Sequence, residues 1–162
     1  MNSSDNKPVA LITGVGPGTG SALVRRFVAG GYRVAMLARD AERLAVLEAE
    51  FPDARAFACD VSDSAAVAAV LARVRAELGA PAVLIHNAVA GGRASFLDMD
   101  PALLERGFQV NVMALLHLAR ALAPDMIAAG AGAIIVTGNT SSQRGRAPFA
   151  GLAPTKAAQR IL

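Results

Sequence analysis

A glycine-rich segment at residues 13–20, with the sequence TGVGPGTG, limits what this chain can fold into more than any other feature. A short apolar run at 9–13 precedes it, and residues 21–29 after it carry apolar side chains at helical spacing. Glycines leave the backbone bare where a phosphate approaches, and the first turn of a helix offers N–H groups and a partial positive charge. We therefore predict a strand, a turn and a helix that bind the diphosphate of a dinucleotide. The residues expected to bind it are Gly14, Gly16, Pro17, Gly18, Thr19 and Gly20.

Two other interpretations of this segment have to be weighed. A tight strand-to-helix turn uses glycine without any ligand, so the motif alone is weak evidence and its context on both sides supplies the rest. A P-loop is excluded, because no Gly-Lys-Ser or Gly-Lys-Thr sequence follows and the lysine that reaches the phosphates is missing.

Short apolar runs and amphipathic segments alternate along the rest of the chain. They predict strands at 9–13, 33–37, 54–59, 82–85 and 133–137, and helices at 21–29, 41–50, 63–78, 101–123 and from 154 onward. Strands that are apolar throughout are buried on both faces, and strand–helix alternation then gives a parallel sheet between helices. We predict a Rossmann-type α/β fold of three layers, with a doubly wound parallel sheet in the order 3-2-1-4-5.

Composition narrows the class of protein further. The 162 residues fit a single domain, 54% of them are hydrophobic, and the net charge of +3 comes from scattered basic residues. This pattern argues against disorder and against a nucleic-acid partner. One cysteine and two histidines offer neither a disulfide within the chain nor a metal cluster. Because residues 1–8 lack an apolar signal-peptide core and the apolar runs are short, we expect a cytoplasmic protein without a membrane span.

The end of the sequence leads to an expectation about the whole domain. The helix that begins near residue 154 stops on the apolar pair Ile161 and Leu162, without a residue that caps it. We therefore expect residues 1–162 to be one dinucleotide-binding domain whose fold continues beyond Leu162.

The residues after the second predicted strand bear on the choice of dinucleotide. Proteins that prefer NAD place an acidic side chain there, on the 2′-hydroxyl of the adenosine ribose. Here the strand ends with Leu37-Ala38, and Arg39 and Asp40 follow. A guanidinium makes charge-assisted hydrogen bonds to a 2′-phosphate, so we predict NADP(H) over NAD(H). The alternative is that Arg39 is a solvated loop residue and Asp40 caps the next helix.

The glycine-rich segment resembles the TGxxxGxG signature of the short-chain dehydrogenase/reductase family. Four further motifs follow in the family's order, namely Asp60-Val61, Asn87-Ala88, Asn111 and Lys156. His86 and Val89, on either side of the second motif, depart from the family's NNAG segment. The resemblance covers residues 8–160 and implies a nicotinamide-dependent oxidoreductase that transfers hydride to or from a carbonyl or alcohol.

The resemblance also implies a role for each matching residue. Asp60 and Val61 would contact the adenine of the cofactor. Asn87, with its neighbour Ala88, and Lys156 would contact ribose. Asn111 would support a water molecule in a proton relay.

The chain departs from the family at the residues that carry out the chemistry. The family has a tyrosine four residues before the lysine, which gives or takes the proton during hydride transfer, and a serine that holds the carbonyl oxygen. Leu152 stands at the tyrosine position and Asn139 at the serine position. Leucine transfers no proton, and asparagine donates hydrogen bonds but is not an acid at neutral pH. General acid–base catalysis is worth about 10²–10⁴-fold in rate, so we expect ordinary ketone reduction to be weak.

Nearby polar side chains offer partial replacements. Ser141 or Ser142 is able to take the serine's role, although hydroxyls that cap a loop after a strand are the commoner outcome. We expect His86 to be neutral and buried, Cys59 to be a small buried hydrophobe, and Thr155 to cap a helix or face solvent. The catalytic candidates are Asn111, Lys156, Asn139 and Ser142.

Three functions are consistent with these residues. The first is an NADP-dependent oxidoreductase with an atypical site and an unknown small-molecule substrate. The second is an NADP-binding sensor, scaffold or regulatory protein without turnover, which Leu152 favours, and the third is a structural homo-oligomer that has lost the nucleotide. By resemblance to the family, we expect a homodimer or homotetramer that associates through the helices at 103–123 and from 155 onward.

Overall fold

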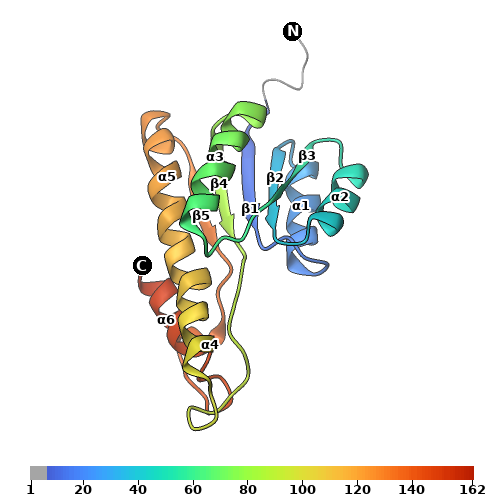
Figure 1. Cartoon of the computed structure of the whole chain (residues 1–162). Helices are drawn as coiled ribbons and strands as arrows, with labels where there is room; N and C mark the ends of the chain where they lie inside the picture. The colour runs from blue at the N-terminus through green and yellow to red at the C-terminus, as the bar shows by residue number, and fades with distance from the viewer. Residues whose placement is uncertain (1–6) are drawn as a thin grey trace.

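The computed structural model describes residues 7–162, which form a five-stranded parallel sheet with helices on both faces (Figure 1). The strand order is β3-β2-β1-β4-β5, which confirms the doubly wound topology expected from the sequence. Residues 1–6, and with them most of the segment in which we expected no signal peptide, lie outside the described residues.

Every predicted element is present, and most ends agree within two residues. The strands are β1 (Val9–Thr13), β2 (Arg33–Ala38), β3 (Ala54–Ala58), β4 (Pro81–His86) and β5 (Ala133–Val136). The helices are α1 (Thr19–Ala29), α2 (Ala41–Glu50), α3 (Ser64–Leu78), α4 (Pro101–Phe108), α5 (Ala114–Ala128) and α6 (Ala153–Ile161). A π-helical turn, η1 (Gln109–Met113), joins α4 to α5, and a 3₁₀ turn, η2 (Thr140–Ser142), follows β5.

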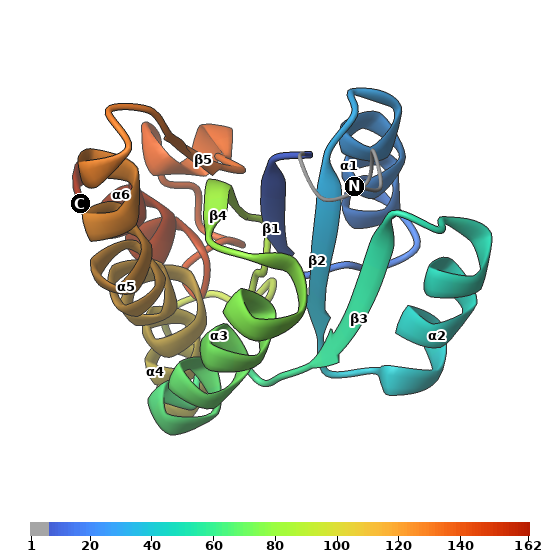
Figure 2. The ribbon, with the colours of Figure 1, turned by 90° about the horizontal axis from the view of Figure 1, so that it is seen from above.

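Two separate cores cover the sheet, because successive side chains of a strand point to opposite faces. Val9 and Leu11 of β1 pack with side chains of α3 and α5, whereas Ala10 and Ile12 pack with side chains of α1 and α2. Figure 2 shows these two groups of helices on opposite sides of the sheet. All five residues of β1 are buried, so the central strand gives the glycine-rich turn a rigid support.

The two edge strands differ from the expectation that every strand is buried on both faces. In β5, the side chains of Ile134 and Ile135 are 42% and 44% exposed. In β3, only Ala54 and Phe57 are buried, and Arg55 and Ala58 are exposed. Each of these strands has a hydrogen-bonded neighbour on one side only, so the helices that cover the centre of the sheet shield it less completely.

The segments α4, η1 and α5 form one uninterrupted helix from Pro101 to Ala128. It is long and apolar enough to span a membrane by length and composition alone, which is weak evidence for a span, and the expectation of no membrane span stays a prediction. However, 39% of its most apolar window is buried inside the protein, and core helices of soluble proteins pass the same test. Leu115, Leu118 and Leu122 of α5 belong to the core beside the sheet.

Candidate functional site

The glycine-rich turn joins β1 to α1 and rests against the residues that follow β4. Gly14 has a φ of +68°, in the left-handed region that side chains disfavour. A Cβ on Gly14 would lie 2.5 Å from the Cα and N atoms of Ala88, and one on Gly20 would lie 2.6 Å from the Gly14 carbonyl oxygen. These two glycines are therefore required for the turn itself to pack.

Gly16 and Gly18 have a different role, because a Cβ at either position would meet no atom within 4 Å. Their bare backbone and Thr19 line an open hollow of about 300 Å³ at the start of α1. The first N–H groups of a helix have no partner within it, and the first turn of α1 contains no acidic residue. These features fit an anion bound at the N-terminus of α1.

Side chains on both sides of the turn hold it in place. Asn87 Nδ2 donates to the Gly14 carbonyl oxygen at 2.8 Å. The Ser21 hydroxyl lies 3.0 Å from the carbonyl oxygens of Pro17 and Gly18, to which it donates. The Asn87 amide, for which the family resemblance implies a ribose contact, thus also fixes the glycine-rich turn.

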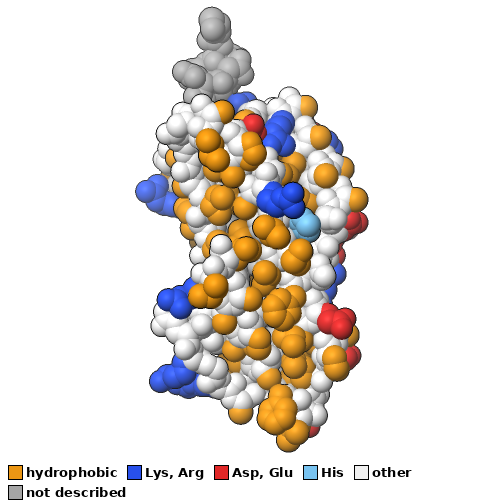
Figure 3. Space-filling model, turned by 90° about the vertical axis from the view of Figure 1, so that its left-hand side faces the viewer, with side chains coloured by type: hydrophobic (Ala, Val, Ile, Leu, Met, Phe, Trp, Pro, Cys, Tyr) orange, Lys and Arg blue, Asp and Glu red, His pale blue; other side chains and the backbone are white. Residues whose placement is uncertain are grey.

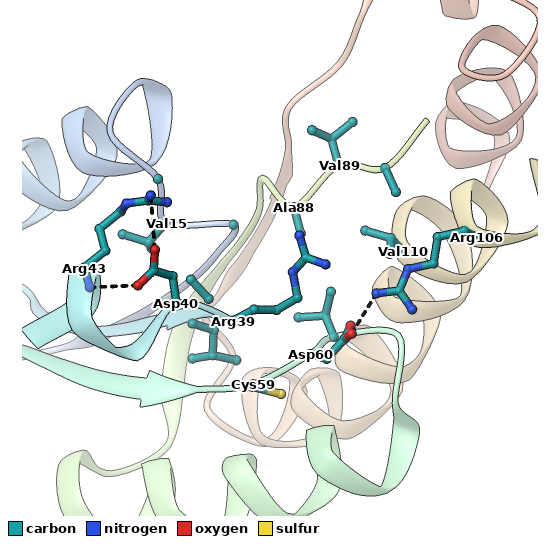
Figure 4. A pocket seen from close by; sticks show the side chains of 16 residues that line it. Val15, Arg39, Asp40, Arg43, Cys59, Asp60, Ala88, Val89, Arg106 and Val110 are labelled. Carbon is teal, nitrogen blue, oxygen red and sulfur yellow. Dashed lines mark hydrogen bonds and ion pairs between the residues drawn. The ribbon is translucent and has the colours of Figure 1, made fainter. Parts of the chain in front are cut away.

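A larger cavity of about 550 Å³ opens beside the turn, at the carboxyl ends of β2, β3 and β4 (Figure 4). Open α/β sheets bind their ligands at this edge. Six residues expected from the sequence to bind the cofactor line it together, namely Gly14, Gly16, Arg39, Asp60, Val61 and Ala88. The hollow at the start of α1, which suits a phosphate, and this larger cavity are therefore adjacent.

Three arginines and two aspartates line this cavity, and two ion pairs neutralise four of the five charges. Asp40 pairs with Arg43 at 3.1 Å and also accepts the Arg43 N–H as the N-cap of α2. Asp60 pairs with Arg106 of α4 at 2.7 Å. Within residues 7–162, Arg39 makes no ion pair, and Figure 4 shows its guanidinium reaching into the cavity between the two pairs. The cavity therefore keeps one uncompensated positive charge.

Asp60 is tied to its surroundings through both carboxylate oxygens. One accepts from Arg106, and the other accepts from the backbone N–H and the hydroxyl of Ser62 at 3.0 and 2.8 Å. Burial acts to raise the pKa of Asp60, but these hydrogen bonds outweigh it and lower the pKa to about 2. The residue expected to contact adenine thus also links α4 to the loop after β3. The neighbouring Cys59 is buried as predicted, and burial raises its pKa to about 11.

His86, fully buried at the end of β4, connects the turn to the long helix. The Thr13 hydroxyl oxygen accepts the backbone N–H groups of Asn87 and Ala88. Its own proton is therefore donated to His86 Nδ1 at 3.0 Å, and His86 Nε2–H donates to the Val110 carbonyl oxygen at 3.0 Å. Burial lowers the pKa of His86 to about 4, so the ring is neutral at pH 7, as expected from the sequence.

Asn111 lies in the π-helical turn and uses its whole side-chain amide to join three segments. Its Oδ1 accepts the Ala90 N–H at 2.9 Å, and its Nδ2 donates to the Ala90 carbonyl and the Thr155 hydroxyl, each at 2.8 Å. Thr155 is fully buried, which corrects the expectation that it faces solvent if it does not cap a helix. Its hydroxyl donates back to Leu152, so it fastens the start of α6 to the π turn.

Lys156 lies on α6 in a separate cavity of about 510 Å³, between β5, α5 and α6. Its Nζ donates to the Thr137 carbonyl at 3.1 Å and to Gln159 Oε1 at 2.8 Å. Gln159 Nε2 in turn donates to the Asn111 carbonyl at 2.6 Å. Burial lowers the pKa of Lys156. Asn111 and Lys156 are thus connected, but through a glutamine side chain.

The residues at the expected tyrosine and serine positions, Leu152 and Asn139, do not line the cavity that contains Lys156. Leu152 is the N-cap residue of α6, and Asn139 is exposed with its Oδ1 accepting the Ser141 N–H at 2.8 Å. Ser141 is buried, and its hydroxyl has no partner among the described residues. Ser142 lines the same cavity as Lys156, so of the two serine candidates it is the one that shares this space.

Within the described part of the chain, no cluster of three metal-ligating side chains exists. The single tyrosine, Tyr32, lies before β2 and packs edge-on against Phe27 with ring centroids 5.2 Å apart. It therefore belongs to the core between β2 and α1 and does not replace the missing tyrosine.

A model of the family described as short chain dehydrogenase matches residues 8–161, which include every motif discussed above. The chain belongs to this family. A short-chain dehydrogenase structure from Streptomyces avermitilis superimposes with a TM-score of 0.91 at 33% identity and covers 96% of this chain. The match covers 58% of that structure.

Curated members of the family are also similar in sequence. The D-erythrulose reductase of Gallus gallus is 36% identical over 94% of this chain and 61% of its own length, and the sorbitol dehydrogenase of Cereibacter sphaeroides is 35% identical over 85% and 53%. A metagenomic short-chain oxidoreductase solved in complex with NADP has a TM-score of 0.89 at 35% identity, over 95% of this chain and 72% of that one. The chain spans between half and two thirds of the length of these curated relatives.

Some residues of this site were not anticipated from the sequence. Arg106 binds Asp60 and Gln159 binds Asn111, each from an element distant in the sequence, and only the register between α4, α6 and the sheet brings them there. Their signal in the sequence was a polar side chain in a mainly apolar helix, which solvent exposure explains equally well.

The buried His86 predicts a specific pH dependence of stability. Its pKa of about 4 in the fold lies below the usual 6.5, so between these values the unfolded chain binds the extra proton. The free energy of unfolding should fall by about 3 kcal/mol as the pH drops from 6.5 to 4. Urea unfolding at a series of pH values measures this loss.

The His86→Asn variant is the matched control, because it keeps a polar side chain and removes the titrating group. Its free energy of unfolding should depend less on pH over the same interval, with His117 still present. Parallel pH profiles for the two proteins would contradict a neutral, buried His86.

The close approach at Gly14 predicts a large difference between two similar substitutions. Gly14→Ala and Gly31→Ala both place a side chain at positive φ, but only at Gly14 would the new Cβ meet backbone atoms. We expect a loss of about 1 kcal/mol for Gly31→Ala and at least about 3 kcal/mol for Gly14→Ala in urea unfolding. Equal losses would mean that the contact with Ala88 is not constraining.

Proposed function

We propose that this chain is the cofactor-binding part of an NADP(H)-dependent oxidoreductase that transfers hydride between the nicotinamide and a carbonyl or alcohol. One observation carries the proposal: an open glycine-rich turn at a helix N-terminus adjoins a cavity with a single uncompensated arginine. A dinucleotide phosphate and an adenosine 2′-phosphate are the ligand groups that such a pair of features would bind.

The residues present fit this cofactor in three places. The backbone at Gly16, Gly18 and Thr19 would hold the diphosphate, since no side chain intrudes there. The cavity lined by Val61 and Ala88 would hold the adenosine. Both are close to the turn, because Gly14 lines both spaces.

The preference for NADP over NAD is argued from charge. An acidic side chain facing the 2′ position would repel a phosphate, but Asp40 is neutralised by Arg43 and occupied as the cap of α2. Arg39 is free to form charge-assisted hydrogen bonds there. Among similar structures, a gluconate 5-dehydrogenase from Burkholderia cenocepacia was solved with NADP, and a reductase from Brucella melitensis was solved with NADH. Relatives with either cofactor thus support a nicotinamide dinucleotide, and Arg39 supports the phosphorylated one.

The chemistry expected of the bound cofactor is hydride transfer, and the chain's own residues would contribute binding and charge. Lys156 carries a buried ammonium next to Ser142, suited to hydroxyl or carbonyl oxygens. Leu152 has no proton to give, so no side chain at that position assists the oxygen. Relatives named as reductases or dehydrogenases of sugars and polyols favour an oxidoreductase over the alternative of a binding protein without turnover. A cytoplasmic location, one domain, and the lack of membrane or nucleic-acid partners stay predictions.

The Arg39 proposal predicts a selective loss of affinity. Calorimetric titration of the Arg39→Ala variant should give NADP binding about 10–100-fold weaker than wild type, because charge-assisted hydrogen bonds are worth about 1.5–3 kcal/mol. NAD binding should change by no more than about threefold, since NAD lacks the phosphate.

Arg26→Ala is the matched control, because Arg26 is an exposed arginine in the last turn of α1, at the opposite end of that helix from the glycine-rich turn. This variant should bind both nucleotides as wild type does. Equal affinity of the wild-type chain for NAD and NADP would overturn the proposed selectivity. The absence of heat with either nucleotide would overturn cofactor binding.

We also propose that copies of the chain associate through the long helix and α6. Figure 3 views the side of the molecule formed by α4, α5 and α6, where apolar side chains gather over a large area. Phe108 and Ile127 on the long helix are 36% and 78% exposed. Contiguous exposed apolar surface of this kind marks interaction sites.

Light scattering tests the association. The protein should have at least twice the 16.5 kDa of one chain, and Phe108→Glu should shift it toward the monomer, because a carboxylate in an apolar interface is costly. Val46→Glu on α2 places the same charge on an exposed apolar residue of another face and should leave the mass unchanged. A monomeric wild-type protein would contradict the proposal.

A further inference from the structure

One side chain, Gln159 on α6, bridges the lysine and the asparagine of the candidate site. Its Nε2 donates to the Asn111 carbonyl oxygen at 2.6 Å, and its Oε1 accepts from Lys156 Nζ at 2.8 Å. The side chain is buried, with 5% exposure for the residue. Both ends of the amide are therefore satisfied, and its two partners lie on different elements.

Neutral groups alone hold the Lys156 ammonium within the described residues. Its hydrogen bonds go to the Thr137 carbonyl and to Gln159 Oε1, and none of the ion pairs among residues 7–162 includes it. It is 4% exposed. Dipoles fix the position of such a cation while leaving its charge uncompensated.

The Asn111 side chain offers no second route from the lysine to the π turn. Its Nδ2 donates to Ala90 and Thr155 and its Oδ1 accepts from Ala90, and within residues 7–162 it makes no hydrogen bond with Lys156. The connection toward Lys156 runs through the backbone carbonyl of Asn111, to which the Gln159 amide donates.

The nature of the bridge decides whether a proton can pass along it. Polar groups separated by a few ångströms inside a protein are commonly bridged by water, which both donates and accepts hydrogen bonds and exchanges protons. A carboxamide makes the same two hydrogen bonds, but at neutral pH it neither takes up nor releases a proton. A glutamine at this point keeps the hydrogen-bond chain continuous and interrupts proton transfer along it.

We propose that Gln159 is a positioning residue that fixes the Lys156 ammonium and insulates it from proton exchange through the π turn. The inference deepens the proposed function and rests on it: Lys156 acts in cofactor and substrate binding by its fixed charge. With leucine at 152, neither the N-cap position of α6 nor this bridge supplies a proton. The substrates that fit such a site are those whose oxygen obtains its proton from solvent.

The chain is suited to a direct test, because it contains only two lysines, Lys7 and Lys156. Nitrogen-15 labelling of lysine gives two Nζ signals whose proton exchange with water is measured by NMR, without cofactor or substrate. Lys7 pairs with Asp53 near the surface and serves as the internal reference. In the wild-type protein, the Nζ protons of Lys156 should exchange at least about tenfold more slowly than those of Lys7, because buried protons reach water only when the structure opens.

Two variants separate insulation from simple packing. Gln159→Ala removes the amide and leaves room for water, so exchange at Lys156 should accelerate about tenfold. Gln159→Met fills a similar volume without hydrogen bonds, so exchange should stay within about threefold of wild type while the Lys156 pKa falls through loss of its acceptor. Amide spectra confirm that each variant is folded.

Exchange in Gln159→Ala equal to wild type would overturn the insulation, and an unchanged Lys156 pKa in Gln159→Met would overturn the positioning. If the alanine variant does not fold, the Lys156 pKa in Gln159→Met still tests the positioning. A separate titration with NADP distinguishes the two proposals. If proton exchange at Lys156 behaves as expected but NADP does not bind, the proposed function fails, while the positioning of Lys156 by Gln159 remains supported.

Discussion

The close contact between the Gly14 backbone and Ala88 is the constraint on which the rest of the site depends. It brings the turn after β1 against the segment after β4, and no side chain larger than hydrogen fits between them. The Thr13 hydroxyl and the Asn87 amide then join the same two segments by hydrogen bonds. As a result, the open backbone at Gly16 and Gly18 faces the carboxyl edge of the sheet, where open α/β folds bind ligands.

From this contact a buried polar path leads to the other half of the site. His86 Nδ1 accepts a hydrogen bond from the Thr13 hydroxyl, and its Nε2–H donates to the Val110 carbonyl in the π turn. The next residue, Asn111, binds the loop after β4 through Ala90 and the start of α6 through Thr155. Because Thr13, His86, Asn111 and Thr155 are fully buried, each hydrogen bond that they left unmade would be costly. Gln159 links Asn111 to Lys156, so the glycine-rich turn and the lysine of α6 are held by one network.

Much of this organisation could be predicted from the sequence. Apolar runs and helical spacing predicted the strand order, since right-handed crossovers leave few other topologies. The glycines and Arg39 predicted a place for phosphate groups because their chemistry is local. The burial of Thr155 and the exposure of Ile134 and Ile135 in β5 were not predicted, because they depend on which helices cover which strand. Contacts such as Arg106 with Asp60, 46 residues apart, arise only from the folded arrangement.

The family's fold is retained here, whereas the sequence predicts that the residues for proton transfer are not, and one physical argument accounts for both. Binding a dinucleotide requires bare backbone and charge, which Gly16, Gly18 and Arg39 supply. Moving a proton requires a titratable group near the reacting oxygen, and Leu152 is not one. The chain is thus suited to holding a cofactor, whatever group completes the reaction.

Backbone amide NMR during titration with NADP tests the central claim most directly. The account predicts that the largest chemical-shift changes occur at the N–H groups of Gly16, Gly18 and Thr19, with further changes at Arg39. A titration that leaves these signals in place, or that shifts only residues around the cavity of Lys156, would contradict it.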